Sequence, residues 1–590
     1  MRKSKIPIKP FLLTAILFFI AQFIYFAIFN RYHLAYQEQI QLFRFDWDYF
    51  APFLAKPGGI SEYLGTFFIQ FYLIPPVGPL IVTLAGIITF ILTGFILKKA
   101  GITGIIWSLI PVLILAALQS DHVYYIGHTT GYILSLSLVA LYVTINKDFL
   151  RFSAGLSGLI LLYPVTGGFS LVALLLMIIF ELFFKTGRQR WLASSLFIFL
   201  TVIYLFILWN YVYLIPLSSD WLMPLLFISN LPTKYWLIIL FLFMPLVMIT
   251  TGIWFRLSGK KEVSLTWNIW TIVAGAVVFL IFSAGIARFA YDYKSELLLG
   301  LDYNIQKGNT DKALWLSART PGSNRLVVYL TNLALAKSGK MGDQLFHFYQ
   351  VGPQGLLLDW GDDAAPFFGS ELFYQLGYIN EAYRWAFEAL VAKGHSPRIL
   401  KRLALTSIIN GQVKVAGKYL DILEQTLFYS KWAKRYKRYL GESEGLVADN
   451  EINDKRNLLI HNDFFADVNN FDTVLGKLLE NHPDNRNAFE YLMSSLLLDK
   501  NLESFAQNIY RLEDLGYTEI PLHYEEALLV HMTNSETNIV PENFSIRESS
   551  RQRFNDYIKT YASYTGNPDN VALFLSRRFG KTYWYYLQFR

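Results

Sequence analysis

Long uncharged runs dominate the first half of the chain. The first, residues 11–29, follows a basic start (Arg2, Lys3, Lys5, Lys9) and has about the length of a membrane-spanning helix. No cleavage site of small residues follows it, so the pattern predicts an uncleaved membrane anchor rather than a signal peptide. Further apolar runs lie near residues 79–97, 102–118, 124–145, 152–163, 167–184, 191–210, 235–255 and 267–289.

One apolar stretch, residues 152–184, is too long for a single span and contains a break. Residues 163–168 read YPVTGG, and a proline beside paired glycines favours a turn. We therefore expect two short helices that re-enter the membrane, which brings the predicted count to nine spans.

The positive charges test this topology, because cytoplasmic segments of membrane proteins are rich in Lys and Arg. With the N-terminus in the cytoplasm, nine spans place fourteen Lys and Arg on the cytoplasmic side. A single span over 152–184 would move the basic segment 185–190 to the wrong side. An odd number of spans places everything after about residue 290 outside the cytoplasm. The opposite side then receives, before the last span, only Arg31, Arg44, Lys56 and Lys234.

After residue 290 the composition becomes that of a soluble helical protein, and a repeat is visible in it. The segments 377–382 (GYINEA) and 411–416 (GQVKVA) stand 34 residues apart and share their glycine-to-alanine spacing. Segment 308–313 has the same spacing, and Gly339 and 501–506 are weaker copies. This period resembles the tetratricopeptide repeat, in which a glycine turns the chain and a small alanine lets paired helices approach.

The repeat resemblance covers about residues 300–510 and implies a stack of helical hairpins with a concave surface for peptides or partner proteins. Generic helical hairpins, or a domain that only caps the membrane half, remain alternatives. The predicted fold is all-α: a polytopic transmembrane bundle (1–290), an extracytoplasmic α-solenoid of repeats (291–540) and a C-terminal aromatic tail (541–590). We expect the tail to pack on the soluble domain or the bilayer surface.

Composition excludes several function classes. Hydrophobic residues make up 54% of the 590 residues and charged residues 16%, and there is no cysteine. Disulfides, thiolate metal sites and cysteine nucleophiles are therefore excluded. Residues 1–290 carry a net charge of +10 (19 Lys and Arg, 9 Asp and Glu), and residues 291–590 one of −3 (33 and 36). Because the soluble half is slightly acidic, we expect no nucleic-acid partner.

Familiar catalytic motifs are also missing from the sequence. There is no glycine-rich phosphate loop and no His-Glu-x-x-His, which argues against an ATP-driven pump and the common zinc proteases. No nucleotide, haem or flavin is expected. The spans hold almost no ionisable residue near the middle of the bilayer, where ion-coupled carriers usually place one.

An acidic loop follows the first predicted span. Asp46 and Asp48 are two residues apart, so in an extended loop their side chains point to the same side. Such a pair can hold Mg²⁺ or Mn²⁺, or one carboxylate can take a proton from an acceptor hydroxyl. Residues 60–68 then suit a helix lying along the membrane interface.

An Asp-x-Asp motif in the first external loop, with an interfacial helix and a bundle of spans, resembles the C-type membrane glycosyltransferases. That family uses polyprenyl-phosphate-linked sugars on the outer face, and many members carry a soluble C-terminal domain. The resemblance covers about the first 290 residues. It implies that Asp46 and Asp48 are catalytic or metal-binding acids. Secondary candidates for holding phosphate, metal or acceptor are Arg44, Asp121, His122 and His128.

Structural explanations stand beside each of these functional ones. Asp46 and Asp48 also suit a solvated loop, Arg44 an ion pair with an acidic neighbour, and the two histidines interfacial hydrogen bonds. The first hypothesis for the whole chain is an envelope glycosyltransferase in a bacterial inner membrane. It would move a sugar or glycan from a lipid phosphate carrier in the membrane lipid to an acceptor on the outer face, and its repeats, in the periplasm, would bind the acceptor or a partner. A membrane-anchored scaffold that binds envelope proteins or peptides is the second. A carrier for a lipid or sugar-lipid is the third.

Overall fold

The computed structural model describes residues 8–187, 189–213, 234–259, 263–264, 280–281, 283–285, 287–320, 324–360, 365–441, 449–460, 464–535, 539–567 and 570–590. The described chain is helical apart from one parallel pairing of two short strands, β1 (Ile102–Thr103) and β2 (Val263–Ser264). It divides into two compact units, Met1–Glu296 and Leu297–Arg590. The expected all-α class is therefore confirmed for the described residues.

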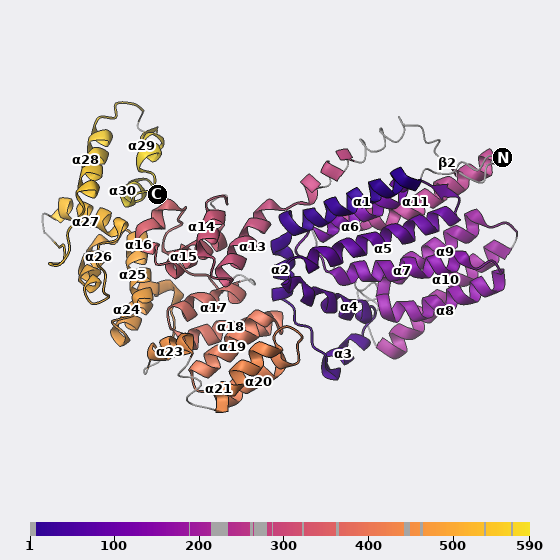
Figure 1. Ribbon diagram of the computed structural model, residues 1–590, viewed down its shortest axis with the longest axis horizontal. Helices are drawn as coiled ribbons and strands as arrows, with labels where there is room; N and C mark the ends of the chain where they lie inside the picture. The colour runs from indigo at the N-terminus through magenta and orange to yellow at the C-terminus, as the bar shows by residue number, and fades with distance from the viewer. Residues whose placement is uncertain are drawn as a thin grey trace. The chain divides into compact units, whose positions relative to one another are not determined.

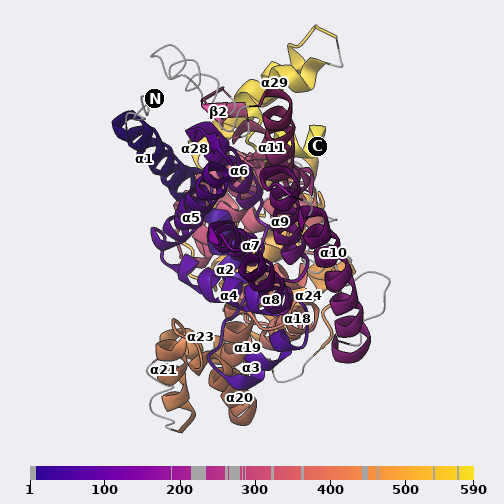
Figure 2. The same ribbon diagram turned by 90° about the vertical axis from the view of Figure 1, so that its right-hand side faces the viewer.

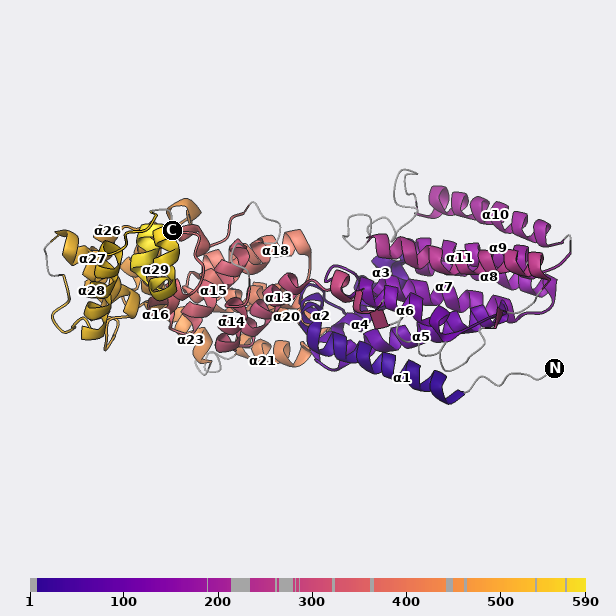
Figure 3. The same ribbon diagram turned by 90° about the horizontal axis from the view of Figure 1, so that it is seen from above.

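The first unit is a bundle of long apolar helices (Figure 1). Helix α5 packs against α6 and α7, and α9 packs against α7, α10 and α11. Helices α1 and α10 lie on opposite sides of this bundle (Figures 2 and 3). The helices of this unit are α1 (Ile8–Ile24), α2 (Arg31–Gln39), α3 (Trp47–Leu54), α4 (Gly59–Ile69), α5 (Val77–Lys99), α6 (Ile105–Gln119), α7 (Ile126–Thr144), α8 (Asp148–Thr166), α9 (Ser170–Phe184), α10 (Gln189–Ile207) and α11 (Lys234–Ser258).

Five helical segments of the described chain are long and apolar enough to cross a membrane, as expected of a membrane protein. The count rises to six if the first helix and α2, which meet at a 66° bend, form one broken span. Helix α6 is apolar but shorter. Most of the predicted run 267–289 lies outside the described residues, so the nine-span topology remains a prediction. The five segments are Val77–Lys99, Ile126–Thr144, Asp148–Phe184, Gln189–Tyr213 and Tyr235–Ser258.

The segment Asp148–Phe184 reverses direction at the turn that the sequence predicts. Arg151 Nε lies 2.7 Å from Glu181 Oε1, whereas a straight helix would separate these residues by about 45 Å. Gly167, between α8 and α9, has φ 59°, a left-handed conformation that glycine adopts without steric cost. The two helices therefore form a hairpin.

The buried Arg151–Glu181 pair closes this hairpin at its open end. Arg151 also donates to the carbonyl oxygens of Ile145 and Asn146 and to the carboxylate of Asp148, and Tyr142 donates to Glu181 at 2.7 Å. Every nitrogen of the guanidinium thus has a partner, which a buried charge requires. The pair ties α7, α8 and α9 together.

The second unit is a succession of short helices, most of which contact the next one along the chain. Helix α16 also contacts α25 and α27, so the helices do not form a strictly linear stack. The helices are α13 (Tyr293–Gln306, which begins in the first unit), α14 (Thr310–Ser317), α15 (Arg325–Lys337), α16 (Met341–Gln344), α17 (Ala365–Gln375), α18 (Ile379–Lys393), α19 (Pro397–Ile409), α20 (Val413–Glu424), α21 (Ser430–Gly441), α23 (Asn450–Asn457), α24 (Phe471–Asn481), α25 (Arg486–Leu498), α26 (Leu502–Asn508), α27 (Leu522–Ser535), α28 (Glu548–Ala562), α29 (Val571–Phe579) and α30 (Tyr583–Phe589).

The repeated sequence segments share one turn geometry. At each of the five turns, the residue after a helix has positive φ, and the next amide donates to a carbonyl five residues back, as in a Schellman cap. Four turns use glycine, whereas the fifth uses Lys500 at φ 61°. The alanines that follow three of the turns, Ala313, Ala382 and Ala416, are fully buried. The turns are therefore a real repeat, while membership of the tetratricopeptide family and a regular solenoid remain predictions.

The aromatic C-terminal tail packs on the second unit. Trp584 donates its indole N–H to the Glu526 carbonyl at 2.8 Å, and Tyr586 donates its hydroxyl to the Leu498 carbonyl at 2.9 Å. The buried Glu526 carboxylate accepts from the Tyr583 amide and from His523. These contacts fix α30 against α25 and α27.

Candidate functional site

Asp46 begins α3 as its N-cap. Its backbone is extended (φ −122°, ψ 159°), and its carboxylate accepts a hydrogen bond from the Tyr49 amide at 2.9 Å. The other carboxylate oxygen lies 3.2 Å from Arg44 Nε. Both contacts are those of a capping residue held by a neighbouring cation. The ion pair with an acidic neighbour, which the sequence left open as an alternative role for Arg44, is present in the structure.

Asp48 lies in the first turn of α3 and is exposed. The prediction that Asp46 and Asp48 point to the same side assumed an extended loop, and this assumption was wrong. Because a helix starts between them, consecutive side chains rotate by about 100° per residue instead of alternating. The side chains of Asp46, which caps α3, and Asp48, which is exposed, therefore do not share one side as they would in an extended loop.

Aromatic side chains fill the space around this acidic turn. The Phe43 ring lies within 6 Å of the rings of Phe45, Tyr49, Tyr63 and Phe67. Burial raises the pKa of Tyr49 to about 12. This cluster joins the acidic loop to α3 and α4.

Asp121 and His122 occupy the turn between α6 and α7. Asp121 accepts from the Val123 amide at 2.9 Å and lies 3.7 Å from His122 Nδ1. Burial lowers the pKa of His122, while the charge of Asp121 opposes this shift. The His122 carbonyl accepts from the amide of Gln37, which ties the turn to α2. The His122 ring also lies 6.2 Å from the Tyr36 ring of α2, so both its backbone and its side chain contact that helix.

His128, one of the predicted site residues, lines a pocket in the first unit. It is half-buried in the first turn of α7, and its ring centre lies within about 6 Å of those of Tyr124, Tyr125 and Phe169. The pocket beside it has a volume of about 390 Å³, which is within the range of small-molecule sites.

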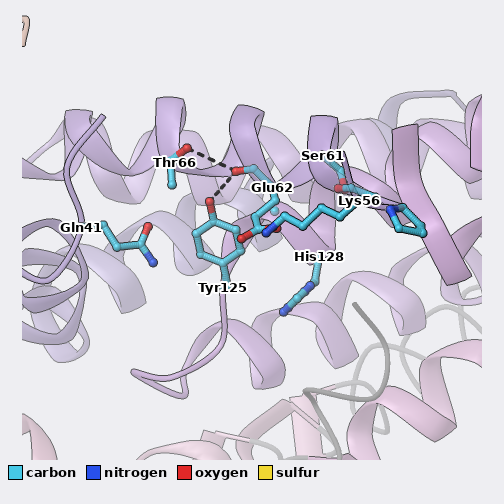
Figure 4. Close-up of a pocket in the computed structure, with 10 residues that line it drawn as sticks. Gln41, Lys56, Ser61, Glu62, Thr66, Tyr125 and His128 are labelled. Atoms are coloured by element: carbon cyan, nitrogen blue, oxygen red, sulfur yellow. Dashed lines mark hydrogen bonds and ion pairs between the residues drawn. The ribbon is translucent and has the colours of Figure 1, made fainter. Parts of the chain in front are cut away.

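Lys56 and Glu62 meet in the middle of this pocket, between Tyr125 and His128 (Figure 4). Lys56 Nζ lies 2.5 Å from Glu62 Oε2, and both side chains are about 40% exposed. The Tyr125 hydroxyl donates to the backbone carbonyl of Glu62 at 2.5 Å, and the Thr66 hydroxyl donates to the same carbonyl. The charged pair is therefore accessible to a ligand while the backbone beneath it is fixed.

A close helix crossing creates the pocket wall. A Cβ atom added at Gly65 of α4 would lie 2.6 Å from the backbone of Gly127 in α7, so only glycine allows this approach. The loop before α4 is anchored by the Gly58 amide, which donates to the Pro164 carbonyl at 3.0 Å in the break of α8. The α4–α7 contact brings Lys56 and Glu62 to His128.

Sequence reasoning missed Lys56 and Glu62. They flank a Pro57-Gly58-Gly59 turn, and opposite charges on either side of such a turn were the available signal. In contrast, the described residues include no group of three or more His, Asp or Glu side chains placed to hold a metal ion. The expected Mg²⁺ or Mn²⁺ site at Asp46, Asp48 and Asp121 thus gains no support.

Comparisons with known proteins identify a family but no activity. No curated protein and no solved structure matches the chain. One family model matches residues 6–590, which covers both units in a single match. The chain therefore belongs to a family of unknown function, DUF6057.

Proposed function

We propose that this chain is a bacterial envelope glycosyltransferase that moves a sugar from a polyprenyl-phosphate carrier to an acceptor on the extracytoplasmic face of the inner membrane. The observation that carries the proposal is the accessible Lys56–Glu62 pair in a pocket of about 390 Å³ at the ends of apolar helices. Such a pocket combines one ammonium, one carboxylate and one imidazole. The nine-span topology would place it on the extracytoplasmic side.

The chemistry follows from these three groups. Lys56 would bind the carrier phosphate as a point charge and stabilise the polyprenyl phosphate that leaves when the sugar C1–O bond breaks. Glu62 would act as the general base: it would take the proton of the acceptor hydroxyl while the acceptor oxygen forms its bond to the sugar C1. His128 would hydrogen-bond a phosphate or sugar oxygen. Asp46 and Asp48 remain alternatives as the base, although Asp46 already caps α3.

Two substitutions separate binding from chemistry. We expect Lys56→Ala to weaken binding of polyprenyl phosphate to the purified protein at least tenfold, measured by native mass spectrometry. Glu62→Gln should retain binding, because it removes a carboxylate that competes for Lys56, and should abolish transfer. Transfer is measured in membranes as release of polyprenyl phosphate from a panel of polyprenyl-phosphate-linked hexoses and pentoses.

Glu503→Gln is the matched control, because Glu503 is an exposed carboxylate in the second unit. It should leave both measurements unchanged. Full transfer by Glu62→Gln would reject Glu62 as the base, and unchanged phosphate binding by Lys56→Ala would reject the pocket as the donor site.

A scaffold that binds another envelope protein is the second candidate, and one observation favours it. The second unit exposes large apolar side chains that its own core does not use; these are Trp315, Phe387, Val391, Leu427 and Phe465. Stable co-purification of an envelope protein that is lost in the Phe387→Ser, Val391→Ser double variant would support the scaffold. A chain that purifies alone in gentle detergent with bound sugar-lipid would contradict it.

A further inference from the structure

A second cavity lies within the C-terminal unit, and nothing in the proposed function uses it. Its volume is about 370 Å³, which also suits a small molecule. Its walls come from α16, from α25, from the loop 516–521 and from Arg547 at the start of α28. Charged side chains of both signs face it: Asp343, Glu490, Glu519, Arg486 and Arg547.

The cavity lining includes carboxylate oxygens that accept no hydrogen bond within the described chain. Glu490 is buried, and both hydrogen bonds it accepts within the described chain, from Arg486 Nε (3.0 Å) and the Tyr517 hydroxyl (2.9 Å), reach the same oxygen, Oε1. Asp343 likewise uses only Oδ1, which accepts from the Leu522 amide at 2.7 Å. Two carboxylate oxygens thus remain for a cation. Burial, reinforced by the charge of Asp343, raises the pKa of Glu490 against the opposing effect of Arg486.

The lining also includes two guanidinium groups, those of Arg486 and Arg547. Arg486 stacks 4.3 Å above the Tyr517 ring and bonds Glu490 only through Nε, so its two Nη atoms face solvent or the cavity. Arg547 is positioned firmly, because its Nε donates to both oxygens of the buried Glu525 and its Nη2 to the Ile520 carbonyl. Its Nη1 lies 4.0 Å from a carboxylate oxygen of Glu519.

We propose that this cavity binds a free amino acid as its zwitterion, with the ammonium group between Asp343 and Glu490 and the carboxylate on Arg486 and Arg547. A zwitterion supplies a partner for both kinds of group, its ammonium for the carboxylate oxygens of Asp343 and Glu490 and its carboxylate for the guanidinium N–H groups of Arg486 and Arg547. A planar carboxylate also fits the guanidinium fork in a bidentate manner. The proposal is independent of the glycosyltransferase reaction in the first unit.

The test uses the full-length protein in detergent and the common amino acids, each at millimolar concentration, with thermal unfolding as the readout. At least one amino acid should raise the Tm, since a ligand that binds only the folded state stabilises it. Its N-acetyl derivative lacks the ammonium and its amide lacks the carboxylate. Each derivative should bind at least tenfold more weakly by titration calorimetry. Equal binding of either derivative, or no binding of any amino acid, overturns the proposal.

Variants assign the binding to this cavity. Asp343→Asn keeps an oxygen for the Leu522 amide while it removes the charge, so it should fold normally and bind at least tenfold more weakly. Glu490→Gln should have the same effect. Glu480→Gln is the matched control, because Glu480 is an exposed carboxylate of α24 outside the cavity. Unchanged binding by folded Asp343→Asn would overturn the assignment.

Discussion

Asp46 illustrates how a residue chosen for chemistry turns out to have a structural task. Its carboxylate caps α3 and pairs with Arg44. We predict that Asp46→Ala costs about 1 kcal/mol of local stability, since loss of an N-cap typically costs ~0.5–2 kcal/mol. Hydrogen exchange of the α3 amides should increase in this variant. Asp48→Ala should change the exchange little, because Asp48 is exposed and accepts no capping bond.

Asp46→Asn separates the two roles of Asp46. Asn is also a good N-cap, so this variant should keep the exchange pattern of the wild-type protein. Loss of transfer activity with unchanged hydrogen exchange would show that the Asp46 carboxylate takes part in chemistry as well.

Lys455 gives the second unit a pH-dependent stability. Burial, helped by the positive charge of Arg402, lowers the pKa of Lys455 to about 8. In the unfolded chain the group titrates near 10.5, so between pH 8 and 10.5 the unfolded state binds more protons. The contribution of Lys455 to stability should therefore become more favourable as the pH rises through this window.

Lys455→Met removes that titration. The Tm of the wild type minus the Tm of Lys455→Met should increase between pH 8 and pH 10. The control Lys393→Met, at an exposed lysine of α18, should show no such pH dependence. A pH-independent difference for Lys455→Met would contradict the lowered pKa.

At the scale of single residues, the sequence identified one residue of the candidate pocket but not the charged pair at its centre. It left an ion pair open as one alternative for Arg44 and placed His128 among the candidates, but it missed Lys56 and Glu62. The reason is tertiary: these two residues meet His128 only because Gly65 and Gly127 let α4 and α7 touch. No local spacing encodes that contact.

At the scale of elements, the α8–α9 hairpin depends on a buried ion pair. Arg151 and Glu181 are both about 95% buried or more, and removal of one partner leaves an uncompensated charge. We predict that Arg151→Leu destabilises the folded bundle by roughly 3–5 kcal/mol, the usual cost of breaking a buried pair. The double variant Arg151→Leu, Glu181→Leu should recover part of this loss, because apolar residues can replace the pair.

Thermal unfolding in a fixed detergent measures this coupling as a double-mutant cycle. Additive losses from the two single variants would show that the pair contributes no mutual stabilisation. Since Tyr142 also donates to Glu181, the cycle is best repeated in a Tyr142→Phe background.

The sequence predicted helix ends correctly where proline or glycine residues mark them. Proline and glycines at 163–168 produced the reversal, and the glycine turns at 377 and 411 produced left-handed caps. Helix α4 shows the limit. Its apolar residues suggested a face on the membrane, yet its buried face consists of Gly59, Ser61, Gly65 and Ile69. Small residues that permit close packing carry little hydrophobic signal, so periodicity does not reveal them.

At the scale of the whole molecule, the sequence placed the change from apolar to soluble composition near residue 290, and the structure divides the chain after Glu296. Glu296 itself belongs to the first unit, where its carboxylate accepts from the amides of Tyr32 and His33 and so caps α2. A carboxylate that caps a helix more than 250 positions earlier in the chain leaves no local pattern. The division was therefore readable from composition, whereas the contact that closes the first unit was not.

The predicted sidedness can be tested directly because the chain has no cysteine, so each introduced cysteine is the sole target of a maleimide. With nine spans, Asp48→Cys and Lys393→Cys should react with a membrane-impermeant maleimide in intact spheroplasts, since both positions are exposed and extracytoplasmic. Lys98→Cys and Lys147→Cys should react only after permeabilisation, because they follow the second and fourth predicted spans, which return the chain to the cytoplasmic side. Labelling of Lys98→Cys and Lys393→Cys in the same compartment would contradict the topology. Because Glu62 lies in the same predicted external segment as Asp48, that outcome would also remove the pocket from the face on which transfer is proposed.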